Sequence, residues 1–130
     1  MRKSSLVCAA LALGAGPAVA ADPTGDWVVA DKSAIIHVAP CGEALCGTVA
    51  WTAKPGVDEN NPDPRKRGNS IVGTRILIGM KPAANRWEGS IYNPENGKIY
   101  SGNITLRQPD VLRVEGCLLV FCGGENWTRR

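Results

Sequence analysis

Apolar and polar residues alternate along most of the chain from about residue 25 onward. In one example, Tyr100, Ile104 and Leu106 fall on one side of an extended segment, and Ser101 and Asn103 on the other, so one face should be buried and one wet. No stretch keeps apolar residues at helical spacing for three turns, and Gly, Pro, Asn and Asp interrupt the pattern about every 8 to 12 residues. This rhythm predicts an all-β sandwich or barrel of short strands.

Eight segments qualify as strands. They cover residues 25–31, 34–39, 47–53, 70–79, 86–92, 98–106, 111–116 and 124–129. The clearest hairpin lies at Asn93-Pro94-Glu95-Asn96-Gly97, where the proline suits the first central turn position and Gly97 accepts a positive φ. We therefore expect the segments on either side of it to pair antiparallel.

The longest irregular stretch runs over residues 54–69, and loops of this length are often functional. Its acidic half, 58–63, offers oxygen atoms that could hold calcium but lacks the spacing of an EF-hand loop. The basic run Arg65-Lys66-Arg67 could pair with those acids or meet an anionic ligand. We expect a solvated loop whose two charged halves pair with each other.

The first twenty residues have the order of a secretory signal peptide. A basic start at Arg2 and Lys3 precedes an apolar stretch over 6–15, and the small-residue run 18–21 supplies a cleavage site after Ala20. The apolar stretch is too short to span a bilayer, which needs roughly 20 residues. The sequence thus predicts a cleaved signal peptide at 1–20 and a single domain at 21–130, in the periplasm or secreted.

Cleavage also changes the charge. The full chain has a net charge of +3, but loss of Arg2 and Lys3 leaves 13 basic residues against 12 acidic ones. So small an excess gives no basis for nucleic-acid binding. No second apolar span follows, so the mature chain should not cross a membrane.

Four cysteines remain after cleavage, in two copies of one spacing. Cys41 and Cys46 are separated by four residues, and so are Cys117 and Cys122. A four-thiolate zinc site would be an alternative in the cytosol, but export favours disulfides. Four cysteines allow three connectivities, and the repeat of the spacing favours the two local pairs.

Little catalytic chemistry is available in the sequence. His37 is the only histidine and no thiol is left free by pairing, so triads and histidine-based zinc sites are not expected, nor is any metal or cofactor. A hydrolase would have to use carboxylates that no motif singles out. The aromatic side chains can serve as core filler or as walls of an apolar cavity. His37 is expected as a partly exposed strand histidine, with a pH-sensitive group beside the cavity as the alternative. The candidate ligand-binding residues are Trp51, Trp87, Tyr92, Tyr100 and His37.

The chain resembles two known groups of proteins. Gly25-Asp26-Trp27 near its start and Trp127-Thr128-Arg129 near its end look like the lipocalin and calycin arrangement. That resemblance implies an eight-stranded up-and-down barrel in which Trp27 packs at the closed end beneath Arg129, as a cation–π pair worth about 1 kcal/mol.

A second resemblance covers nearly the whole mature chain, through Cys41-Gly42, Leu45-Cys46-Gly47, Trp51, Asp58, Asn61-Pro62-Asp63-Pro64, Gly73, Trp87, Ile91-Tyr92-Asn93-Pro94, Gly97, Tyr100, Gly116-Cys117 and Trp127-Thr128-Arg129. In order and spacing these residues look like the bacterial exported family known as domain of unknown function 2147. The resemblance implies a small lipocalin-like barrel in the cell envelope and transfers no catalytic residue.

We therefore expect an exported, non-enzymatic protein that binds a small apolar or amphipathic ligand. The alternative is an envelope module with a filled barrel that presents the 54–69 loop to a protein or polymer partner. Eight strands enclose an interior just wide enough for side chains or one small ligand, so size does not decide between the two.

Overall fold

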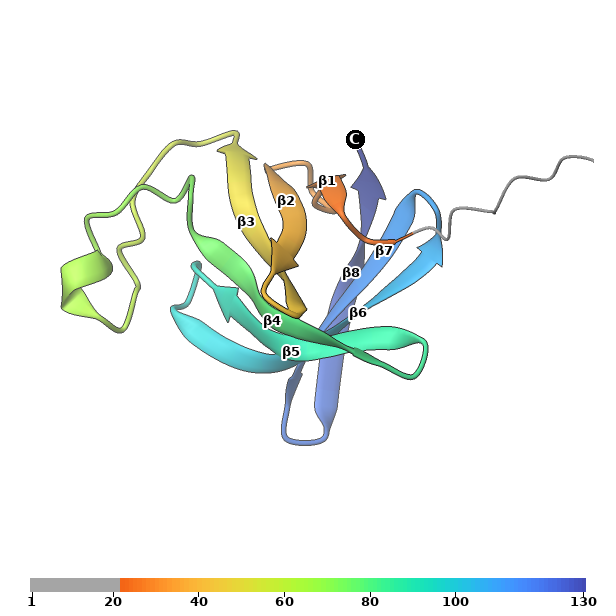
Figure 1. The fold of residues 1–130 in the computed structure, drawn as a ribbon. Helices are drawn as coiled ribbons and strands as arrows, with labels where there is room; N and C mark the ends of the chain where they lie inside the picture. Colours follow the sequence, from red (N-terminus) through yellow and green to blue (C-terminus); the bar gives the residue numbers. More distant parts are fainter. Residues whose placement is uncertain (1–21) are drawn as a thin grey trace, which may run out of the picture.

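Eight antiparallel strands make up the computed structural model, which describes residues 22–130. The strands are β1 (Gly25–Val28), β2 (Ala34–Cys41), β3 (Ala44–Thr52), β4 (Arg75–Ala83), β5 (Arg86–Asn93), β6 (Lys98–Gln108), β7 (Val111–Leu118) and β8 (Phe121–Arg129). Each pairs with its neighbour in sequence and β8 pairs with β1, which closes an up-and-down barrel (Figure 1). The predicted fold class is confirmed. The predicted signal peptide lies outside the described residues.

The barrel interior is filled by side chains from every strand. Trp27, Leu77, Met80, Ile104 and Leu112 have no exposed surface at all. They belong to one cluster of twelve buried residues, the others being Ile36, Val38, Val49, Ile76, Tyr92, Val114 and Trp127. The alternation in the sequence arises because successive side chains of a strand point to opposite faces, and only one face meets this core.

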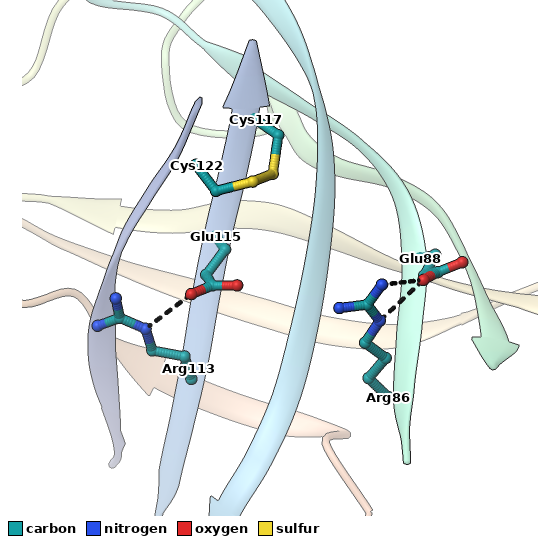
Figure 2. The surroundings of a disulfide bond; sticks show 6 residues. All are labelled: Arg86, Glu88, Arg113, Glu115, Cys117 and Cys122. Atoms are coloured by element: carbon teal, nitrogen blue, oxygen red, sulfur yellow. Dashed lines mark hydrogen bonds and ion pairs between the residues drawn. A yellow bond between two sulfur atoms is a disulfide. The ribbon is translucent and has the colours of Figure 1, made fainter. Parts of the chain in front are cut away.

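Asn103 departs from that alternation. It was predicted on the wet face of its strand but is only 7% exposed. Glu88 of β5 and Glu115 of β7 flank it in register, and each forms an ion pair with an arginine two residues earlier on its own strand (Figure 2). Long charged side chains on both neighbouring strands thus cover a short polar one.

One end of the barrel is closed by Arg129. Its guanidinium carbon lies 4.3 Å from the centre of the Trp27 ring. The same guanidinium donates hydrogen bonds to the backbone carbonyls of Asp22, Thr24 and Pro109, at 2.9, 2.7 and 2.8 Å. The last strand is thereby tied to the segment before β1 and to the β6–β7 turn.

The opposite end carries the longest connection, residues 53–74 between β3 and β4, with a single 3-10 turn, η1 (Pro64–Lys66). We call it the open end; the β1–β2, β5–β6 and β7–β8 turns also lie there. Strand β4 begins at Arg75, five residues later than predicted. The intervening residues form a turn instead, in which the Thr74 amide donates to Ile71 and Gly73 has a φ of 98°.

Two disulfides join neighbouring strands. Cys41–Cys46 spans the β2–β3 turn and Cys117–Cys122 spans the β7–β8 turn, so both local pairs are confirmed. Cys117 and Cys122 face each other in register, 4.0 Å apart at Cα (Figure 2). Among the described residues, no helix has the length and apolar character that a membrane crossing requires.

Candidate functional site

A cleft of about 770 Å³ lies at the open end, between the β3–β4 connection and strands β4 to β6. We call it the loop cleft. Its lining residues come from the connection (Asp58, Asn61, Pro62, Asp63, Lys66, Asn69, Ser70, Val72, Gly73 and Thr74) and from the strands (Arg75, Ile78, Tyr92 and Ile99). The volume falls within the range of small-molecule sites.

A buried carboxylate fixes the connection to the barrel. Asp58 is 2% exposed, and its two carboxylate oxygens accept hydrogen bonds from the Tyr92 hydroxyl at 2.7 Å and from Asn61 Nδ2 at 2.8 Å. Burial, and then the hydrogen bond and charge of Asp58, raise the pKa of Tyr92 to about 12. The phenol therefore stays protonated and donates to Asp58 at all physiological pH values.

A second contact ties the connection to the β5–β6 turn. Asn60 Nδ2 donates to the carbonyls of Pro94 and Glu95, at 3.3 and 3.0 Å. Gly97 in that turn has a φ of 71°, and a Cβ added to it would collide with the backbone of Asn60. Glycine therefore satisfies both the turn and the close approach of the connection.

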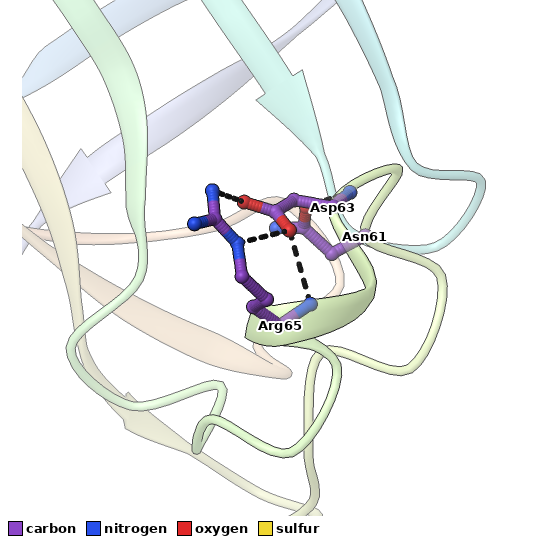
Figure 3. Close-up of polar contacts among 3 residues, drawn as sticks. All are labelled: Asn61, Asp63 and Arg65. Atoms are coloured by element: carbon purple, nitrogen blue, oxygen red, sulfur yellow. Dashed lines mark hydrogen bonds and ion pairs between the residues drawn. The ribbon is translucent and has the colours of Figure 1, made fainter.

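The η1 turn is organised by Asp63 (Figure 3). One oxygen of its carboxylate accepts from the Arg65 backbone N–H at 3.0 Å and from Arg65 Nε at 3.1 Å, and the other lies 3.0 Å from an Arg65 terminal nitrogen. These hydrogen bonds hold the pKa of Asp63 below its ordinary value. The Asp63 amide in turn donates to Asn61 Oδ1 at 2.8 Å, which links the turn to the Asp58 contact.

The remaining cleft wall combines apolar groups with positive charge. Val72, Ile78 and Ile99 provide the apolar surface, and Lys66 and Arg75 provide two cations. The four ion pairs of the described residues involve neither cation. The wall therefore offers an apolar surface together with two cations that form no ion pair in the described chain, although the charge of Lys66 helps to lower the pKa of Asp63.

The predicted ligand-binding aromatic residues are distributed over the barrel. Tyr92 lines the loop cleft, whereas Trp87 lines a smaller cleft of about 340 Å³ beside the β2–β3 turn. Trp51 is 48% exposed and lines neither cleft. The Tyr100 hydroxyl accepts a hydrogen bond from Asn96 Nδ2 at 2.8 Å within the β5–β6 hairpin.

His37 lies on the outside of the barrel wall. It faces Asp26 across the β1–β2 pair, with Nδ1 and Oδ1 2.7 Å apart, and both side chains are partly exposed. Of the five predicted residues, the structure therefore brings only Tyr92 into the loop cleft.

Lys66 belongs to the basic run for which an anionic ligand was one of two expectations, whereas Arg75 and the aliphatic residues of the cleft were not predicted. No local pattern marks Arg75 or Val72, because the folding of the connection against the sheet brings them together. A signal did exist in Asp58, Asn61 and Asp63, which carry the family resemblance and line the cleft.

The cleft contains the two carboxylates that a carboxylate-based hydrolase would need, yet each is already engaged. Asp58 accepts from Tyr92 and Asn61, and Asp63 holds Arg65. Within residues 22–130, no three His, Cys, Asp or Glu side chains gather closely enough to hold a metal ion. Both acids of the cleft thus hold the connection in its conformation.

Comparison with known proteins gave one family and one solved structure. The structure is protein HP1028 from the human pathogen Helicobacter pylori, described as belonging to the lipocalin family; the TM-score is 0.76 at 17% identity, over 85% of this chain and 84% of that one. At this identity the likeness establishes the fold alone. No curated protein matches the sequence. The family match extends over residues 25–129, and the chain therefore belongs to the family described as "Uncharacterized protein conserved in bacteria (DUF2147)".

Proposed function

We propose that the protein is an exported, non-catalytic binding protein for a small amphipathic anion, which it holds in the loop cleft. The observation that carries this proposal is the cleft itself, in which Lys66 and Arg75, neither of them in an ion pair of the described chain, adjoin an aliphatic wall. Export is supported by the two disulfides, which persist in oxidising compartments, and by membership of a bacterial family. The periplasm or the medium would be its location.

The ligand class follows from the lining. An anionic head group would approach Lys66 and Arg75, and its apolar part would cover Val72, Ile78 and Ile99. Nine of the fourteen lining residues are polar or charged, so the cleft suits an amphipathic ligand better than a purely apolar one. Because the twelve core side chains fill the barrel, we place the ligand beneath the connection and outside the interior.

A titration tests the proposal with dansyl-undecanoic acid as the fluorescent probe and its methyl ester as the neutral counterpart. We expect the acid to bind and the ester to bind several-fold more weakly, because the ester lacks the charge that the cations attract. Native mass spectrometry of the exported protein would show whether a molecule of this class co-purifies.

Charge-removing variants locate the binding site. Lys66→Gln and Arg75→Gln should each weaken binding of the acid about 3- to 10-fold and leave the ester unaffected, which corresponds to about 1 kcal/mol for an exposed charge contact. Lys81→Gln is the matched control, since Lys81 is an exposed cation on the same strand as Arg75 but toward its other end. Absence of binding, or equal effects of all three changes, would refute the proposal.

A second candidate function is presentation of the 54–69 loop to a partner. It is favoured by the tethers through Asp58 and Asn60, which hold the loop in one conformation while residues 64–70 stay exposed. Lack of any probe binding, together with a specific partner lost on Arg65→Gln and Arg67→Gln, would favour this function over the first.

A further inference from the structure

The end of the β7–β8 hairpin is an unusually apolar surface. Residues 116–124 include no charged side chain and no hydroxyl or amide side chain. Four successive members, which we call the apolar tip, are largely exposed: Leu118 by 60%, Leu119 by 90%, Val120 by 86% and Phe121 by 78%. Contiguous exposed apolar residues mark protein–protein or membrane contact sites.

The apolar tip projects beyond the barrel wall. On one side, the pairing of β6 with β7 ends at Ser101 and Cys117; on the other, β1 reaches β8 only at Thr128 and Arg129. No described strand therefore flanks the hairpin beyond its disulfide. Figure 1 shows the blue hairpin extending past the other strands, and Figure 2 shows the Cys117–Cys122 bond that joins its two strands.

The shape of the tip selects its partner. The four side chains surround a convex turn, so a flat protein surface could cover only part of them. They are also far fewer than the roughly 20–30 residues per side of a stable protein interface. A phospholipid bilayer can close around a convex apolar group from all sides. From the disulfide to the turn the hairpin extends about 7 Å, at roughly 3.4 Å per residue, which matches the roughly 5–10 Å depth of interfacial insertion.

We propose that the apolar tip inserts into the surface of a phospholipid bilayer and holds the protein there reversibly. The disulfide keeps the two strands together where neighbouring strands are missing. Glu125, the first charged residue on β8, would remain outside the apolar layer, since its carboxylate accepts from Trp127 Nε1 and the Ala30 amide. The inference does not depend on whether the loop cleft takes a ligand.

Sedimentation with vesicles tests the proposal. The disulfide-bonded protein is mixed with phosphatidylcholine vesicles and with mixed phosphatidylethanolamine and phosphatidylglycerol vesicles. We expect binding to both, with little dependence on salt, because apolar burial and not charge drives insertion. The double variant Leu119→Asn with Val120→Asn should lower the partition coefficient at least about 10-fold, since two side chains lose their burial. Asparagine is chosen because Leu119 has a φ of 59°, which asparagine tolerates.

Two further variants make the result specific. Val57→Asn, at an exposed valine of the β3–β4 connection, should leave the partition coefficient within about twofold. In Val120→Trp, the added indole should be quenched by brominated phosphatidylcholine and shift its emission to shorter wavelength. Unfolding curves check that each variant is folded.

The proposal is overturned if the protein stays in the supernatant with both vesicle types, or if the double variant partitions like the parent. It is equally overturned if sedimentation equilibrium shows a dimer that the double variant abolishes while no vesicle binding occurs, because the tip would then join two copies of the chain. Lys66→Gln should weaken binding of dansyl-undecanoic acid and leave vesicle binding unchanged. Failure of one proposal is therefore distinguishable from failure of the other.

Discussion

Tyr92 determines how the connection is held against the barrel. Its hydroxyl satisfies a carboxylate that is almost completely buried, and a buried acceptor left without its donor costs about 1–3 kcal/mol. Tyr92→Phe should lower the free energy of unfolding by that amount in urea titrations at neutral pH. Tyr100→Phe is the control, because its hydroxyl accepts only an exposed hydrogen bond, and its cost should stay below about 0.5 kcal/mol. Equal costs would mean that the Asp58 contact is not stabilising.

The same residue gives a pH dependence. The pKa of Tyr92 is raised from 10.0 to about 12, so the neutral phenol is the form favoured by folding. Its contribution is complete below pH 10 and is lost as the pH rises from about 10 to about 12. The difference in unfolding free energy between the parent and Tyr92→Phe should therefore shrink over that interval. A constant difference would indicate that the phenol titrates normally in the fold.

The strands and the β5–β6 hairpin were predictable because their signals are local. Two-residue alternation and turn chemistry depend only on neighbours in the chain, and each of the eight predicted segments overlaps one strand of the structure, although several bounds differ. The start of β4 was wrong because the apolar residues Ile71 and Val72 belong to a turn that only Gly73 and its hydrogen bonds reveal. The loop cleft was not predictable, because its walls join Asp58 to Tyr92 across the fold.

Two glycines have nearly the same backbone conformation. Substituting each of them distinguishes the cost of a positive φ from the cost of disturbing the connection. Gly42 and Gly97 have φ values of 72° and 71°, but a Cβ at Gly42 would meet nothing within 4 Å, whereas one at Gly97 would collide with the Asn60 backbone. Gly42→Ala should cost about 1 kcal/mol from φ alone. Gly97→Ala should cost at least about 1 kcal/mol more, and it should weaken probe binding by displacing the connection. Urea unfolding of both variants measures the difference. Equal costs would show that the Asn60 backbone moves to accommodate the added Cβ without a loss of stability.

Closure of the whole barrel rests on a short seam. β1 and β8 share only two register pairs, Trp27 with Arg129 and Val28 with Thr128. The sequence resemblance had indicated this junction through Trp27 and Arg129, yet it could not show that the rest of β8 has no partner on that side. β1 ends at Val28, so beyond the seam β8 pairs with β7 and has no strand on its other side.

Amide exchange along β8 should therefore alternate. Cys117 and Cys122 lie 4.0 Å apart at Cα, the short spacing of a pair without mutual hydrogen bonds, so the amide of Cys122 points away from β7. By the same alternation, the amides of Gly124 and Asn126 also point to the side of β8 that has no neighbouring strand. Those of Gly123 and Glu125 point to β7 and bond to it. Hydrogen exchange followed by NMR should find Cys122, Gly124 and Asn126 fast and the other two at least about 10-fold slower. Uniform protection that grows with protein concentration would instead mean that a second copy pairs along this edge, because only an added strand could satisfy those amides.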